Sequence, residues 1–92
     1  MERAQADELL AELDNGWQIA ERGHLLLEKT YKFKDFAQAL DFVNRTGALA
    51  EERAHHPDIY LAWGRVRVTI WTHTVKGLTE SDFVFAAKCD RL

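Results

Sequence analysis

The sequence predicts an α+β fold in which three helices pack on one face of a four-stranded antiparallel sheet. One observation is the order of the expected elements along 92 residues, which is helix, strand, strand, helix, strand, strand, helix. A second is that the first and second strands, and the third and fourth, are each separated by a short segment containing glycine, as in a hairpin. The other face of the sheet would then be open to solvent, a ligand or a partner.

The composition is that of one small globular domain spanning residues 1–92. Hydrophobic residues make up 47% and charged residues 29%, with a net charge of −3. This charge balance predicts no nucleic-acid or membrane partner, and no apolar run approaches membrane length. Cys89 is the single cysteine, so neither a disulfide within the chain nor a thiolate metal site is expected. The chain does not start like a signal peptide, and we expect a cytoplasmic protein.

The first half of the chain is expected to form a helix and a pair of strands. Residues 3–13 suit a short helix that ends at Asn15-Gly16, because glycine is favoured just past a helix. Residues 17–21 and 24–33 are expected to be strands joined at Arg22-Gly23. In the second strand, alternate apolar residues share one face, interrupted only by Lys29: Leu25, Leu27, Tyr31 and Phe33.

Two further helices are expected from their caps. Asp35, with Gln38 three residues later, starts a helix that runs to about Arg53. Thr79, with Asp82 in the third helical position, starts the last helix. The residues expected to face the core are Phe36, Ala39, Leu40 and Val43 in the first of these helices, and Phe83, Ala86 and Ala87 in the second.

Residues 58–63 and 66–72 are expected to form a hairpin around Gly64-Arg65, since glycine first in a two-residue loop fits a type II′ turn. This register pairs Trp63 with Val66 and places both on the apolar face. Continued past the strands, it sets His56 opposite His73, where Cβ atoms are about 4.5–5.5 Å apart.

His55, His56 and His73 are therefore expected to form a cluster at one edge of the sheet. Imidazole titrates near neutral pH, so one ring can serve as general acid while another serves as base. The alternatives are that His55 and His56 lie in an exposed turn, that His73 is a polar strand end, or that the three bind zinc. His24 is expected to be structural or exposed, and the three tryptophans to be packing residues.

The chain resembles the pterin-4a-carbinolamine dehydratase family. The resemblance lies in "EERAHHPDIYLAW" and "THTVKGLTESD", and "NGWQIAE" and "YKFKDFAQAL" are similar to the family's opening strand and main helix. The motif positions are Glu51, His55, His56, Pro57, Trp63, His73 and Asp82. Animal members carry Asp where this chain has Ala54.

The resemblance implies an enzyme that removes water from 4a-hydroxytetrahydropterin to give quinonoid dihydropterin, in pterin recycling after aromatic amino acid hydroxylation. It implies no metal or organic cofactor, and a homodimer or homotetramer. The catalytic residues it implies are His55, His56 and His73, and the substrate-binding residues are Trp17, Glu51 and Pro57. Asp82 is interpreted as a helix cap and dipole partner.

A non-catalytic binding or assembly module with the same fold is the alternative function. The resemblance allows it, because related proteins act as assembly factors and animal members bind a transcription factor. The set of three histidines favours the enzyme. The sequence leaves open which histidine is acid and which is base, and which pterin is the substrate.

Overall fold

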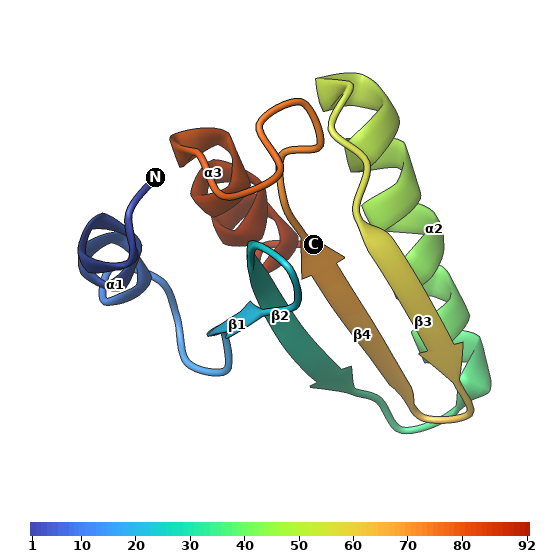
Figure 1. Cartoon of the computed structure of the whole chain (residues 1–92). Helices are drawn as coiled ribbons and strands as arrows, with labels where there is room; N and C mark the ends of the chain where they lie inside the picture. Colours follow the sequence, from blue (N-terminus) through green and yellow to red (C-terminus); the bar gives the residue numbers. More distant parts are fainter.

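The computed structural model describes residues 1–92 as three helices and one four-stranded antiparallel sheet, so the predicted α+β fold is confirmed (Figure 1). The elements are α1 (Arg3–Leu10), β1 (Gln18–Glu21), β2 (Leu25–Lys32), α2 (Phe36–Arg53), β3 (Asp58–Ala62), β4 (Arg65–Ile70) and α3 (Glu80–Cys89). The strand order is β1-β2-β4-β3, which leaves β1 and β3 as the edges. None of the helices combines the length and apolar character that crossing a membrane requires.

The hydrophobic core lies between the sheet and all three helices. Leu27 of β2 and Val66, Val68 and Ile70 of β4 are fully buried at alternate strand positions, which point to one face. The helices contribute Ala6 from α1, Ala39, Phe42, Leu49 and Ala50 from α2, and Phe83, Phe85, Ala86 and Cys89 from α3. The three helices therefore cover one face of the sheet, and the opposite face stays open.

The helix starts follow the predicted caps. The Asp35 side chain accepts a hydrogen bond of 2.9 Å from the backbone N–H of Gln38 at the start of α2. Thr79 and Asp82 form a capping box at the start of α3, in which each side chain binds the other residue's backbone N–H. Only α1 departs from its expected length, because it ends at Leu10 rather than residue 13.

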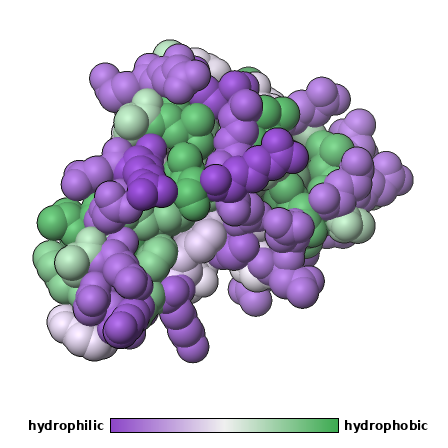
Figure 2. All heavy atoms as spheres, turned by 180° about the vertical axis from the view of Figure 1, so that it is seen from behind, coloured by the Kyte–Doolittle hydropathy of each residue, from purple (hydrophilic) through white to green (hydrophobic).

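The core-facing side of α2 matches the expected one only in part. Ala39 is buried and Val43 packs against the core, as predicted, but Phe36 and Leu40 are 44% and 40% exposed. The other buried positions are Phe42, Thr46, Leu49 and Ala50. The Thr46 hydroxyl can be buried because it donates to the Phe42 carbonyl at 2.9 Å. Seen from behind, hydrophobic atoms show as patches between hydrophilic side chains (Figure 2).

The β3–β4 hairpin turns one residue earlier than predicted. Ala62 pairs with Arg65, so the loop is Trp63-Gly64 and not Gly64-Arg65. The pairing shifts by two residues, which leaves every side chain of the strands on its expected face. Trp63, however, moves from the apolar face into the turn, where it is 68% exposed.

The position of this turn is fixed by contact with the end of β2. The Gly64 carbonyl accepts a hydrogen bond of 2.8 Å from the Phe33 N–H. A Cβ atom on Gly64 would lie 3.1 Å from the Phe33 carbonyl oxygen, which is tighter than ordinary packing. Gly64 thus allows the end of β2 to pack closely against the turn. The sequence pattern of the hairpin alone does not show this contact.

A buried carboxylate joins the end of α3 to the β1–β2 hairpin. Asp90, whose side chain is 6% exposed, accepts from the Lys29 ammonium at 2.8 Å, the Trp17 indole N–H at 3.0 Å and the Tyr31 hydroxyl. Burial, reinforced by the hydrogen bond to Asp90, raises the pKa of Tyr31 above its usual range. This contact explains why Lys29 interrupts the apolar face of β2.

Candidate active site

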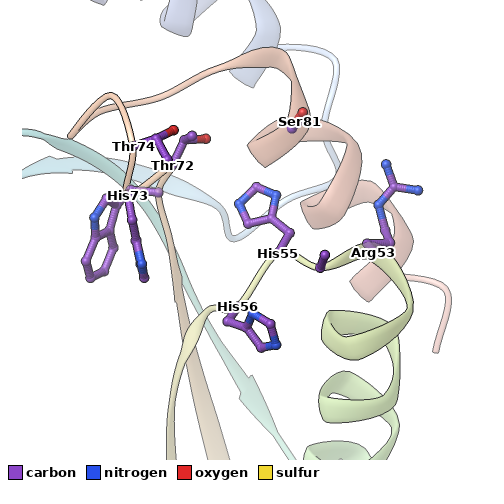
Figure 3. A pocket seen from close by; sticks show the side chains of 9 residues that line it. Arg53, His55, His56, Thr72, His73, Thr74 and Ser81 are labelled. Atoms are coloured by element: carbon purple, nitrogen blue, oxygen red, sulfur yellow. The ribbon is translucent and has the colours of Figure 1, made fainter.

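A pocket with a volume of about 340 Å³ opens where the end of α2, the end of β4 and the start of α3 meet (Figure 3). Its lining residues are Arg53, Ala54, His55, His56, Trp71, Thr72, His73, Thr74 and Ser81. The three predicted histidines thus lie around one cavity. Two follow α2 directly, and the third follows β4, so the pocket depends on the tertiary fold.

The backbone at Ala54 sends the two adjacent histidines in different directions. Ala54 has φ 50 and ψ 40, the left-handed conformation that commonly ends a helix. The His55 N–H then reaches back to the Ala50 carbonyl at 3.1 Å. In Figure 3 the ring of His55 lies towards α3, whereas the ring of His56 turns towards α2.

His55 is held by a buried carboxylate. Its Nε2 lies 2.7 Å from Oδ1 of Asp82, a close polar contact without the alignment of a regular hydrogen bond. The His55 side chain is 14% exposed and that of Asp82 is fully buried. The ring also packs against Phe85, with centroids 5.5 Å apart. The contact with Asp82 therefore orients the His55 ring from its buried side.

Asp82 is itself fixed by two donors to its other oxygen. Oδ2 accepts from the backbone N–H of Thr79 and from the hydroxyl of Thr72, each at 2.8 Å. The interpretation of Asp82 as a helix cap is confirmed, but the same carboxylate also contacts His55. Its place in the family motif was the available signal for that second role.

His56 pairs with a solvent-exposed carboxylate. Its Nε2 lies 2.5 Å from Oε2 of Glu51, which is one turn earlier on α2. The two side chains are 59% and 78% exposed, so water screens the attraction. Glu51 does not line the pocket, and its contact acts on the direction of the His56 ring.

His73 lies on the opposite wall, where its ring is tilted by 42° against an indole ring. The centroids of His73 and Trp71 are 4.6 Å apart, and His24 contacts Trp71 at 5.0 Å. His24 also contacts the Leu25 carbonyl through Nδ1 at 3.0 Å and does not line the pocket. Trp71 therefore places His73 at the mouth of the pocket.

The predicted cross-strand pairing of His56 with His73 is wrong. The ladder between β3 and β4 ends at Asp58 opposite Thr69, and Thr72 instead forms an isolated bridge with Gly77. The chain after β4 turns back on itself there and carries His73 into a loop. The two histidines share a pocket because both loops end at the same edge of the fold.

None of the three expected substrate contacts, Trp17, Glu51 and Pro57, lines this pocket. Trp17 is buried in the core with 5% exposure, and its indole N–H is taken by Asp90. Pro57 is half-buried and does not line the cavity. Trp71, interpreted from the sequence as a packing residue, is the tryptophan in the pocket wall. No three His, Cys, Asp or Glu side chains are arranged to hold a metal ion.

Comparison with known proteins agrees with this architecture. The family described as Pterin 4 alpha carbinolamine dehydratase matches residues 1–92. A Rickettsia bellii protein provisionally named a pterin-4-alpha-carbinolamine dehydratase is 52% identical over 92 residues, covering 100% of this chain and 80% of that protein. A Rubrobacter xylanophilus protein with the same provisional name is 55% identical over 85 residues, covering 92% of this chain and 78% of that protein.

Two solved structures share the fold. The transcriptional coactivator/pterin dehydratase from Brucella melitensis has a TM-score of 0.90 and 35% identity, covering 99% of this chain and 95% of that one. A pterin dehydratase-like protein identified as a RuBisCO assembly factor in the alpha-carboxysome has a TM-score of 0.72 and 28% identity, covering 84% and 88%. On the match over its full length, the chain belongs to the pterin-4-alpha-carbinolamine dehydratase family.

Proposed function

We propose that this protein removes water from a 4a-hydroxytetrahydropterin to give the quinonoid dihydropterin, and so serves pterin recycling after aromatic amino acid hydroxylation. The observation that carries the proposal is the convergence of His55, His56 and His73 on one pocket in a chain of this family. A volume of about 340 Å³ suits a small bicyclic ligand.

The chemistry requires one proton to be delivered and one to be removed. Loss of hydroxide from carbon 4a needs a proton on the leaving oxygen, and the new double bond needs a proton taken from a ring nitrogen. Two imidazoles in different protonation states meet both needs, and such catalysis contributes about 10²–10⁴-fold. Glu51 directs His56, while His55 and His73 approach the cavity from opposite walls.

Purified protein is expected to dehydrate a 4a-hydroxytetrahydropterin without added metal, because its pocket offers imidazoles and hydroxyls but no cluster of metal ligands. The measurement is the rate of quinonoid dihydropterin formation before and after EDTA treatment. The rate should be the same in both. A rate that EDTA abolishes and zinc restores would contradict the metal-free mechanism.

A binding or assembly function is the second candidate. The RuBisCO assembly factor with a TM-score of 0.72 shows that the fold is found in a protein with an assembly role. The sheet face opposite the helices is open here and carries Tyr60 and Arg67, both exposed. The dehydration assay separates the two, since a binding module would give the uncatalysed rate.

We also propose that the chain self-associates as a homodimer or homotetramer. Its sheet ends in two edge strands, β1 and β3, whose outer backbone groups have no partner strand. Pairing of such an edge with a second copy would satisfy those groups. Sedimentation at micromolar concentration should give a multiple of 10.6 kDa, and a species of 10.6 kDa alone would contradict the proposal.

A further inference from the structure

We propose that Asp82 is a positioning residue that fixes the tautomer of His55, so that Nδ1 of His55 is the proton acceptor in the pocket. The catalytic consequence rests on the proposed dehydration. The tautomer itself is a property of the folded chain and can be measured without substrate.

The argument starts from the carboxylate of Asp82, which is fully buried. Its Oδ2 is engaged by two donors, Thr79 and Thr72, and its Oδ1 has only Nε2 of His55 within reach. An ionised carboxylate can only accept hydrogen bonds. A bare Nε2 would set two lone pairs against each other at a buried position, which is costly. The proton of the neutral ring therefore resides on Nε2.

The other ring nitrogen of His55 is then an acceptor. Neutral imidazole carries one proton, so with Nε2 protonated the lone pair is on Nδ1. Nδ1 makes no hydrogen bond within the chain and is not enclosed like Nε2, and the residue lines the cavity. A ring N–H of a bound pterin can donate to it directly.

The proton balance of the proposed step follows from this assignment. Nδ1 of His55 takes the proton of the ring nitrogen beside carbon 4a. The electron pair of that N–H bond forms the C=N bond as the bond from carbon 4a to oxygen breaks. The leaving oxygen receives a proton from His73 on the opposite wall and departs as water. His55 ends protonated and His73 neutral, and exchange with solvent restores both.

The test is Asp82→Asn in the full chain. Asparagine retains an oxygen for Thr79 and Thr72 but presents an amide N–H to Nε2 of His55, which must then accept. The proton moves to Nδ1, which can no longer serve as a base. We expect kcat to fall on the order of 10²-fold. We also expect ¹⁵N NMR of the side chain to show Nε2–H in the wild type and Nδ1–H in the variant.

Matched variants separate positioning from loss of a helix cap. Asp35→Ala removes the side-chain cap of α2 away from the pocket, so it should lower the melting temperature and change kcat less than about 3-fold. Asp82→Asn added to His55→Ala should lower kcat no further.

Two results would overturn the inference: a wild-type His55 protonated on Nδ1, or an Asp82→Asn variant with unchanged kcat. If the wild type shows no dehydration at all, the proposed function fails. The NMR measurement then decides the tautomer by itself.

Discussion

His73→Ala should lower kcat on the order of 10²-fold while changing the free energy of unfolding by less than about 0.5 kcal/mol. The reason is that His73 is exposed and lies against Trp71 in the pocket wall, so its loss removes the proton donor of the proposed mechanism and little packing. The matched control is His24→Ala. His24 contacts the same indole from outside the pocket, and its loss should leave kcat within about 3-fold of wild type.

The same series tests whether the imidazoles act as one unit. Groups that act together are non-additive, so the double variant of His55 and His73 should lose far less than the product of the two single losses. Steady-state rates and thermal melts of all four proteins complete the cycle. Fully multiplicative losses would show that the rings act independently, and equal losses in His24→Ala and His73→Ala would assign the effect to Trp71.

Asp90→Ala should destabilise the fold by about 3 kcal/mol or more, because it strands a buried ammonium. Lys29, whose side chain is 14% exposed, would lose its ionic partner, and the indole of Trp17 would lose its acceptor. For a domain of this size the melting temperature should fall by more than about 10 °C. Urea denaturation and thermal melts provide the measurement.

Asp41→Ala is the matched control for this prediction. Asp41 also pairs with a basic side chain, Arg45, at 2.9 Å, but both partners are about 60% exposed. Its removal should cost about 0.5 kcal/mol or less. If the two aspartate variants melt at the same temperature, Asp90 contributes no more than a surface pair.

The features predicted correctly from the sequence are those encoded locally. Helix caps at Asp35 and Thr79 and the end of α2 at Arg53 depend on residues within a few positions, and the structure has them where the pattern indicates. The hairpin register failed because Gly64 is fixed by the end of β2, which lies about thirty residues earlier. A local turn rule cannot include such a contact.

The candidate site was predicted in part for the same reason. His55, His56 and His73 do line one pocket, but through two loops at one edge of the fold rather than through strand pairing. Trp17 was the expected pocket tryptophan, but Trp71 lies in the pocket wall instead. The reason is that the indole N–H of Trp17 donates to the buried carboxylate of Asp90. Such a contact spans most of the chain and leaves no local pattern.

A buried carboxylate at each end of α3 contacts another part of the fold. Asp82 contacts His55, and Asp90 contacts the β1–β2 hairpin. The consequence concerns the order in which the chain is made. All three histidines precede Asp82, so they emerge during synthesis before the group that orients His55. A chain that stopped short of Asp82 would contain every imidazole of the pocket and still lack the carboxylate that contacts His55. Completion of α3 is therefore also the completion of the site.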